Sequence, residues 1–554
     1  MAGGATVRGA AVQVNRSRLA LLLLAGVPPL LQEAALVTIG FNGARGLAPQ
    51  VTAVWPYDSF HDLRWLLVYH DSWWTFLLGL VVLVLLRGLM SAALTALAWP
   101  ARVPRPTFGW LVRRNIEVAA LALVVISPWA AISVAFAAVA LSLYLFASLA
   151  PMLVLAPFLQ RAGMVGAWWR GLPTIELAGW TMLNFAVLTV AGAVITSVPG
   201  WWGVAVAGLA GVANGLLWRR TVAAAVAPAR VRWARVPVAP VAILLTMAGA
   251  VGAQSVAATV SGPPGEWTPP VVTERLPDRV PHAVIAIAGH DSHWTGREPV
   301  DPRVERFSYA GLDARGRPRP YQPLDTHQSL DSSAVLLAAQ VEALHKRTGR
   351  PVGLVGFSEG AMVARTYLDK WPRPSPVEAA ILISPLIQPG RAYYPPPGHS
   401  GWGVVAGWEL RGIFWLANLG REVKDDPDEP FVRSILVNAP FYRNRTLCPV
   451  AGVRTIAFLP TVSAAEAPPG EYSQVPVFQL PAFHGGIIGR QVAQDRVVDF
   501  LAGDQTDTPR REYRLFQRLG AAWQAPPLPL MLNPVWAAGR EGDPAFSGRI
   551  CQPR

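Results

Sequence analysis

Charged side chains are scarce in this chain, at 15% of 554 residues, whereas an average soluble protein carries about 25%. This scarcity argues against a single soluble domain of this length. Hydrophobic residues make up 52% of the chain, which excludes an intrinsically disordered protein because disorder requires low hydrophobicity. The chain also shows no internal repeat with the period of a solenoid.

Lysine is nearly absent, with three residues among 48 basic ones, and we interpret this as genome composition rather than function. The net charge of +13 would suit a nucleic-acid-binding protein, but its distribution argues against that class. Residues 1–260 hold 17 arginines against six acidic residues, whereas residues 261–554 hold 31 basic against 29 acidic residues. Positive charge concentrated in the more apolar half is typical of the cytoplasmic loops of a membrane protein.

Long apolar stretches alternate with short arginine-bearing segments over residues 19–259. A helix needs roughly 20 apolar residues to cross a bilayer. The stretches that meet this requirement are 19–41, 73–93, 116–136, 139–159, 174–197, 200–218 and 236–258. We therefore predict an α-helical membrane domain of about seven spans over residues 1–260, whose first span is an uncleaved anchor.

The arginines also predict the orientation of this domain. With seven spans and a cytoplasmic N-terminus, the segments at 8–18, 102–114, 161–170 and 219–235 all lie on the cytoplasmic side. We predict a multi-pass protein of the cell membrane, with the chain after residue 260 outside the cytoplasm. Arg87 is expected to snorkel to the cytoplasmic face. The polar loop at 42–72 is expected to form a contact surface for the second domain. Alternatively, it could bind a metal or contribute to the substrate site.

The two cysteines, Cys448 and Cys551, both fall in the half that is predicted to be external. An oxidising compartment allows them to form a disulfide. Such a bridge closes a loop of about 100 residues, worth roughly 4–5 kcal/mol in the chain-entropy model. The alternative is a pair of unrelated buried thiols.

A Pro- and Gly-rich linker at residues 261–280 is expected to hold the second domain a short distance off the bilayer. In residues 281–554, predicted strands occupy 283–288, 304–309, 351–356, 379–384, 454–459 and 476–480, and predicted helices occupy 329–346, 361–371 and 490–501. This alternation predicts an α/β domain with a mostly parallel sheet that is covered by helices on both faces.

A Gly-Phe-Ser-Glu-Gly motif at residues 356–360 follows one of these strands and precedes a helix. In a G-x-S-x-G motif the serine occupies a strained strand-to-helix turn, where side chains in place of the glycines would collide with neighbouring backbone. With this motif, residues 280–505 resemble the α/β-hydrolase superfamily, in particular its lipases and esterases. The resemblance implies a nucleophilic Ser358 and a general base at His484, just after the last predicted strand.

The same resemblance implies an acidic partner for the histidine in the loop after the fifth predicted strand. That loop contains no aspartate, and Glu466 is the first candidate and Glu471 the second. Asp425, Asp426 and Asp428 are alternatives if the segment that holds them folds over the site. Without an acid, we expect a less well oriented histidine and a lower, but not abolished, activity.

For the oxyanion hole, the resemblance implies the backbone N–H of Glu359 and one from the turn at 289–291, which we assign to His290. His290, Asp291 and His293 also form a short cluster, but such spacings are common by accident. We therefore predict no metal and no other cofactor. Residues 307–326 resemble the stretch that leads to the mouth of the site in lipase-like hydrolases, although an ordinary loop is an equally good interpretation.

Residues 386–447 separate two predicted strands and are too long for a plain crossover. In the α/β-hydrolase superfamily such an insertion is usually a cap that shapes the acyl pocket. Its aromatic residues favour an apolar substrate drawn from the outer leaflet. We assign Phe357, Trp408 and Trp415 as candidate substrate-binding residues, with the alternative that the aromatic side chains of the insertion pack only its own core.

Together these features predict a membrane-anchored serine hydrolase, similar to esterases and lipases, that acts on an apolar or lipid ester through an acyl-serine intermediate. Two alternatives stay open at this point. An acyltransferase would use the same three residues with an alcohol in place of water. A non-catalytic membrane scaffold or binding protein would keep only the fold.

Overall fold

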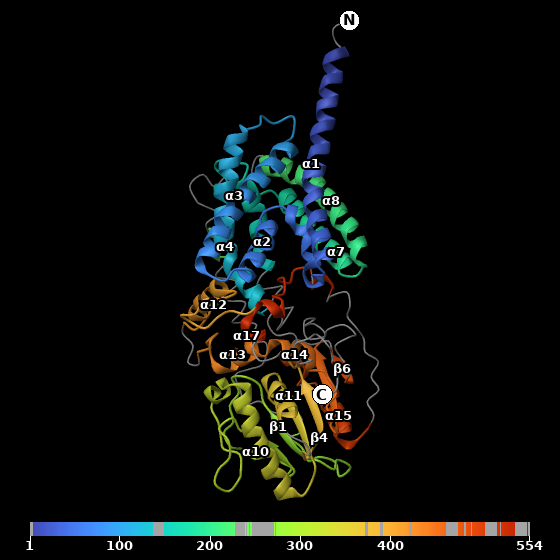
Figure 1. Cartoon of the computed structure of the whole chain (residues 1–554), viewed down its shortest axis with the longest axis vertical. Helices are drawn as coiled ribbons and strands as arrows, with labels where there is room; N and C mark the ends of the chain where they lie inside the picture. The colour runs from blue at the N-terminus through green and yellow to red at the C-terminus, as the bar shows by residue number, and fades with distance from the viewer. Residues whose placement is uncertain are drawn as a thin grey trace.

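The computed structural model describes most of the chain. The described residues are 4–136, 149–227, 239, 241–242, 244–245, 271, 273–371, 375–387, 392–419, 424–460, 475–480, 484–488, 490–504, 518–520, 522–537 and 551. Figure 1 shows a helical half above, a half built on a sheet below, and helices α12, α13, α14 and α17 where the two halves meet.

Five described helices are long and apolar enough to cross a membrane. They are α1 (Gly4–Thr38), α3 (Trp73–Ala98), α4 (Phe108–Phe136), α7 (Ile175–Ile195) and α8 (Gly200–Val226). Each overlaps one of the predicted spans: α3, α4 and α8 contain theirs, whereas α1 and α7 end two or three residues earlier than predicted. Of the predicted span at 139–159 only the end is described, in α6 (Ala150–Ala162), and the span at 236–258 lies largely outside the described residues. A membrane domain is thus supported, with five candidate spans among the residues that the structure describes.

The segment that we expected to be an external polar loop lies inside the helical half. It forms η1 (Asn42–Thr52) and α2 (Tyr57–Val68), which pack against α1, α4 and α7. Trp55, Tyr57 and Phe60 are fully buried there. The prediction missed this because hydropathy counts the charged residues of the segment as exposed. In the structure they pair with residues of neighbouring helices, Arg45 with Glu33 of α1 and Asp62 with Arg87 of α3.

Arg87 contradicts the snorkelling prediction. Its guanidinium is buried, donates to both carboxylate oxygens of Asp62, with Nη2 2.6 Å from Oδ1, and donates to the carbonyl of Val51. Because α2 and η1 bring these acceptors into the bundle, the arginine does not need to reach the membrane surface.

The second half is built on a six-stranded sheet in which every neighbouring pair of strands is parallel, as predicted. The strand order is β2-β1-β3-β4-β5-β6. The strands are β1 (Ala283–Ile287), β2 (Val304–Arg306), β3 (Val352–Phe357), β4 (Val377–Ile383), β5 (Arg454–Pro460) and β6 (Val477–Leu480).

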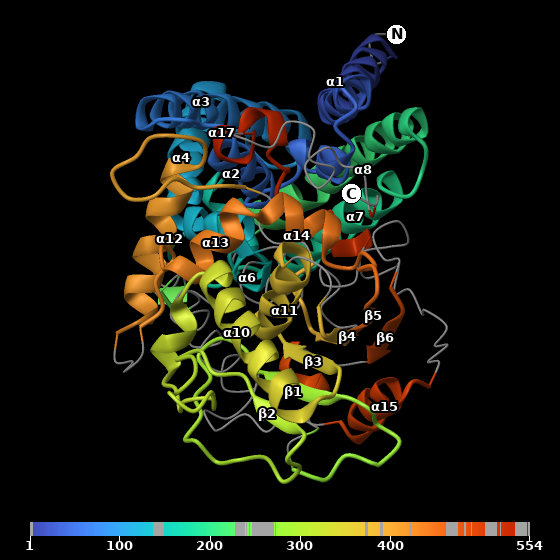
Figure 2. The same ribbon diagram turned by 60° about the horizontal axis from the view of Figure 1, so that its bottom comes forward.

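Helices cover both faces of this sheet because successive strand residues point to opposite sides. In β1, Ile285 joins the core that includes α10 (Leu330–Thr348) and α11 (Glu359–Lys370). Its neighbour Val284 joins the core that includes α15 (Gln491–Ala502). Figure 2 shows α10 and α11 on one side of the strands and α15 on the other.

The insertion between β4 and β5 connects the two halves. It contains α12 (Val404–Ala417), α13 (Pro430–Val437) and α14 (Ala439–Arg445). Helix α12 packs against α4, whereas α13 packs against α10, and α14 is bonded to α11 through Tyr442 and Thr366. The insertion and the C-terminal segment share one hydrophobic core with the membrane helices, whereas the sheet packs in cores of its own. Residues 261–270 of the linker, which we expected to hold the second domain off the bilayer, lie outside the described residues.

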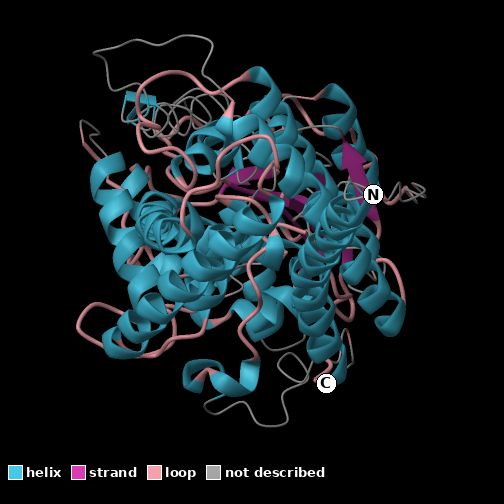
Figure 3. Ribbon diagram, turned by 90° about the horizontal axis from the view of Figure 1, so that it is seen from above, coloured by secondary structure: helices cyan, strands magenta, loops and turns pink. Residues whose placement is uncertain are grey.

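The C-terminal segment also returns to the helical half. Trp523 stacks on Phe185 with ring centroids 4.7 Å apart, and its carbonyl accepts a hydrogen bond of 2.5 Å from Arg64. Further along, η7 (Leu530–Leu532) and α17 (Pro534–Ala537) follow, and the Trp536 indole donates to the carbonyl of Leu436 in α13. Seen from above, the helices hide most of the sheet (Figure 3).

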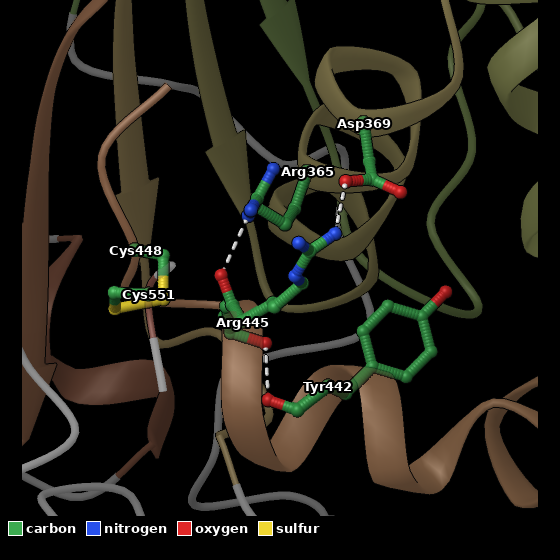
Figure 4. Close-up of a disulfide and its surroundings, with 7 residues drawn as sticks. Arg365, Asp369, Tyr442, Arg445, Cys448 and Cys551 are labelled. Atoms are coloured by element: carbon green, nitrogen blue, oxygen red, sulfur yellow. Dashed lines mark hydrogen bonds and ion pairs between the residues drawn. A yellow bond between two sulfur atoms is a disulfide. The ribbon is translucent and has the colours of Figure 1, made fainter. Parts of the chain in front are cut away.

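The predicted disulfide between Cys448 and Cys551 is confirmed (Figure 4). It joins the segment between α14 and β5 to a residue near the C-terminus, 103 positions later in the chain. Next to it, Arg445 of α14 pairs with Asp369 of α11 at 3.4 Å and accepts a hydrogen bond from Arg365 through its carbonyl. The bridge therefore fixes Cys551 to the segment that leads into β5.

Candidate active site

Ser358 lies in the turn between β3 and α11, at the carboxyl edge of the sheet. Its φ of 53° is left-handed, a conformation that costs a non-glycine residue roughly 1–3 kcal/mol. The bond from the Ser358 N–H to the carbonyl of Ile383 at the end of β4, 2.9 Å long, holds the turn. A strained serine between a strand and a helix is the conformation that a G-x-S-x-G motif requires.

Gly356 and Gly360 flank Ser358 in the motif, and neighbouring backbone occupies the space that a side chain would need at either position. A Cβ on Gly356 would lie 2.4 Å from the carbonyl oxygen of Gly360, and a Cβ on Gly360 would lie 2.3 Å from that of Ile287. Both distances are shorter than any real Cβ contact. The sequence-based explanation of these glycines is confirmed.

His484 approaches the serine from the loop after β6, at the start of η6 (His484–Ile487). Its Nε2 lies 2.9 Å from Ser358 Oγ, within hydrogen-bond distance. The Ser384 hydroxyl donates to the His484 carbonyl at 2.8 Å, and the Phe357 ring packs beside the imidazole with centroids 5.6 Å apart. The sequence analysis did not identify Ser384, which has no motif around it and whose partner is 100 positions away.

The first two candidates for the acidic partner of His484 follow β5 in the chain. Glu466 and Glu471 both lie outside the described residues. Of the alternatives, Asp428 is engaged elsewhere, in a bidentate pair with Arg411 at 2.5 and 2.9 Å. Asp425 lies in a different cluster, described below.

The loop after β1 passes directly beside the serine. A Cβ on Gly289 would lie 3.1 Å from Ser358 Cβ, so only glycine fits there without displacement. In the part of the chain that the structure describes, the backbone N–H groups of His290 and Glu359 donate to no acceptor. Two free N–H groups beside a serine are the donors that an oxyanion hole needs.

The side chains of these two residues connect the loop to the helix. Glu359 is fully buried, and its Oε2 lies 3.2 Å from Nδ1 of His290. Burial raises the pKa of the Glu359 carboxyl, against the opposing effect of His290. Burial disfavours the charged imidazole, but hydrogen bonds with Glu359 and Glu429 outweigh it, and the pKa of His290 is raised. The pair fixes the position of the His290 N–H relative to that of Glu359.

Trp408 and Trp415 lie away from the serine, on α12. Trp415 lines a cavity of about 670 Å³ between α12 and the membrane helices α3 and α4, and neither Ser358 nor His484 lines this cavity. Trp408 packs under the guanidinium of Arg411, 5.3 Å from the ring centroid. The structure therefore brings Phe357, but not these two tryptophans, to Ser358.

The lining of the cavity is almost entirely apolar. Its aliphatic and aromatic residues include Phe76, Leu80, Val84, Leu123, Trp129, Ile132 and Trp415. The exceptions are the Glu409 carboxyl and the Ser127 hydroxyl of α4, which donates a hydrogen bond to it. Burial raises the pKa of Glu409 to about 7. Such a cavity suits an alkyl chain better than a polar group.

No protein-family model, curated protein or solved structure matches this chain. Its chemistry is therefore inferred from geometry alone. A serine hydroxyl within hydrogen-bond distance of an imidazole, beside two free backbone N–H groups, is an arrangement that can attack a carbonyl carbon and stabilise the resulting oxyanion.

Proposed function

We propose that this protein is a membrane-bound serine hydrolase of the α/β-hydrolase type, similar to esterases and lipases, which cleaves an apolar or lipid ester. The observation that carries the proposal is the distance of 2.9 Å between Ser358 Oγ and His484 Nε2 at a turn where the serine has a φ of 53°. A buried structural serine has no need of this strained conformation.

The proposed reaction has two stages. His484 removes the proton of Ser358 as Oγ attacks the acyl carbonyl, and the N–H groups of Glu359 and His290 stabilise the oxyanion. The leaving alcohol takes the proton from His484 Nε2, which leaves an acyl ester on Ser358. Water, deprotonated by the same imidazole, then attacks the acyl carbon. The bond to Ser358 Oγ breaks, Oγ takes the proton back from His484, and the acid is released. We assign Glu466 as the residue that orients His484.

The contact between the insertion and the membrane helices supports an apolar substrate. The side of α12 that carries Trp415 faces a cavity lined by α3 and α4, and Trp415 and Leu416 are 66% and 50% exposed. Apolar side chains that are exposed beside membrane helices are compatible with acyl chains. We infer that the alkyl part of the substrate reaches the protein from the bilayer along α12.

The arrangement of the arginines supports an extracytoplasmic sheet half. At one end of the bundle Arg114 bonds to the carbonyl of Ala162 and Arg220 lies over Trp180. At the other end the Asp71 carbonyl accepts from Gly401 of the insertion. Positive charge thus gathers at the end opposite to the sheet half, as the positive-inside rule requires of a cytoplasmic end. The disulfide between Cys448 and Cys551 also favours an oxidising compartment.

A fluorophosphonate probe tests the proposal, because it reacts with activated serines. The full chain in detergent or native membranes should be labelled, and labelling should be lost in Ser358→Ala. Ser400→Ala is the matched control, since Ser400 lies in a similar Gly-His-Ser-Gly stretch on an exposed segment. Absence of labelling in the wild type would overturn the proposal in favour of a non-catalytic binding protein.

Product analysis with a purified ester then separates two kinds of enzyme. Release of free acid in water indicates a hydrolase. Formation of a new ester when an acceptor alcohol is added, at the expense of free acid, indicates an acyltransferase that uses the same residues.

A further inference from the structure

A group of histidines and carboxylates surrounds His290, in the loop that passes beside Ser358. One ligand atom from each of His290, Asp291, His327 and Asp425 lies within 4.8 Å of the others. These residues come from three segments: the loop after β1, η3 (Pro323–His327), and the part of the insertion that precedes α13. No local sequence pattern connects them.

The backbone and packing hold these side chains in place. The Asp291 N–H donates to Thr326 Oγ1 at 3.0 Å, which joins the β1 loop to η3. His327 Nε2 lies 2.8 Å from Asp291 Oδ1. The His290 ring stacks on Phe431 of α13 with centroids 4.6 Å apart. The donor atoms are thus prepositioned by the fold rather than carried on free loops.

Two further carboxylates surround the group. Glu429 is buried, with Oε1 3.2 Å from His290 Nε2 and Oε2 2.6 Å from His327 Nδ1. Glu359 is fully buried, and while Oε2 approaches His290, Oε1 has no hydrogen-bond partner. A buried carboxylate oxygen without a donor is costly unless positive charge lies nearby.

Negative charge exceeds positive charge in this cluster. Among the described residues, no arginine or lysine pairs with Asp291, Glu359 or Glu429. Even two fully protonated imidazoles would not balance these three carboxylates. A bound cation would remove the imbalance.

We propose that His290, Asp291, His327 and Asp425 bind a divalent metal ion, with zinc as the preferred ion. Two imidazole nitrogens and two carboxylate oxygens form a tetrahedral set that suits zinc, whereas magnesium and calcium prefer six or more oxygens. Glu359 then accepts from the second ring nitrogen of His290, as carboxylates behind metal-bound histidines commonly do.

The site connects the insertion to the active-site loop. Asp425 belongs to the insertion, and His290 supplies one of the two N–H groups beside Ser358. Bound metal would therefore fix the insertion against the sheet half at the site. Metal binding does not depend on the proposed hydrolysis, so either idea can fail without the other.

The test uses the full chain in detergent, purified with an affinity tag that contains no histidine and treated with EDTA. Zinc is added in the presence of a chromogenic chelator, bound metal is counted by mass spectrometry, and the melting temperature is recorded. We expect one zinc per chain and a higher melting temperature with zinc. His327→Ala and Asp425→Asn should each weaken zinc binding by at least about 10-fold. Loss of a residue that only hydrogen-bonds to a metal ligand already costs that much.

His293→Ala is the matched control, because His293 belongs to the same loop but not to the four-residue group, and its affinity for zinc should equal that of the wild type. If His327→Ala fails to fold, Asp425→Asn decides, since it keeps the size of the side chain. Zinc well below one per chain, equal affinity in Asp425→Asn and the wild type, or tighter binding of calcium or magnesium would each overturn the proposal.

Discussion

Both halves of the molecule bury charged side chains, but they balance them differently. In the helical half, Arg45 meets Glu33 at 2.7 Å and Arg87 meets Asp62 at 2.6 Å. In the sheet half, Glu359 and Glu429 are buried with histidines as their only described ionic partners.

The difference indicates what each group of charges does. A buried ion pair in which an arginine balances the carboxylate fixes the packing of elements, and its removal costs mainly stability. An unbalanced group stores unfavourable energy and is retained where it binds or activates something. We therefore infer that the buried charges of the bundle stabilise its packing, whereas those at the carboxyl edge of the sheet serve binding or catalysis.

The largest expected effect is on turnover in the sheet half. Ser358→Ala, His484→Ala and the double variant should each lower hydrolysis of a p-nitrophenyl ester by at least about 10,000-fold, because residues that act as one unit are not additive. The melting temperatures should stay close to that of the wild type. A double variant with a loss equal to the product of the single losses would contradict a shared role.

The next effect tests the bundle. Arg87→Met leaves Asp62 buried without its partner and should cost about 3–5 kcal/mol of stability, whereas Arg87→Met with Asp62→Leu should recover much of this loss. Thermal unfolding in detergent, followed by tryptophan fluorescence, measures both. Arg113→Met is the matched control, since Arg113 is 84% exposed and its pair with Glu117 is worth at most about 1 kcal/mol. Equal losses for Arg87 and Arg113 would contradict the structural role assigned to the buried charges of the bundle.

The disulfide tests how firmly the C-terminal region belongs to the sheet half. Cys448→Ser with Cys551→Ser releases a loop of 103 residues and should lower stability by about 2–4 kcal/mol. Reduction of the wild type should give the same shift in melting temperature, and reduction of the double variant should give none. A double variant as stable as the wild type would show that packing alone holds this region.

The smallest effect concerns the junction of the halves and depends on pH. His70 accepts a hydrogen bond of 2.9 Å from the Val405 N–H through Nε2, and its Nδ1 bonds to the Leu66 carbonyl, so the imidazole must be neutral. Burial lowers the pKa of His70 to about 4. As pH falls, the unfolded chain takes up a proton on His70 before the folded protein does. The contribution of neutral His70 to the free energy of unfolding is therefore present above pH 6.5 and is lost as pH falls toward 4.

At pH 5 the loss amounts to about 2 kcal/mol. His70→Gln keeps an acceptor for Val405 but does not titrate, so the melting temperatures of variant and wild type should converge as pH falls from 7 to 5. A constant difference over this range would contradict the assignment.

The sheet half could be predicted in large part because its signals are local. Apolar runs alternate with helical periods, and the motif around Ser358 defines a turn by itself. The burial of α2 could not be predicted, because Asp62 is acceptable in the bundle only with Arg87, 25 positions away. His327 and Glu429 were missed, and Asp425 was considered only as a partner of His484, for the same reason. These residues come from separate segments, and their spacing along the chain does not show that they lie close to His290.

The place of Trp523 has a consequence for biogenesis. The bundle takes this side chain between Tyr57 and Phe185, and Arg64 bonds to the carbonyl of Trp523. Tyr57 and Phe185, which are translated early, thus gain this packing partner only after the ribosome has translated the sheet half. Assembly of the membrane part is therefore completed after synthesis of the sheet half, and a chain that stops before residue 520 leaves that part incomplete.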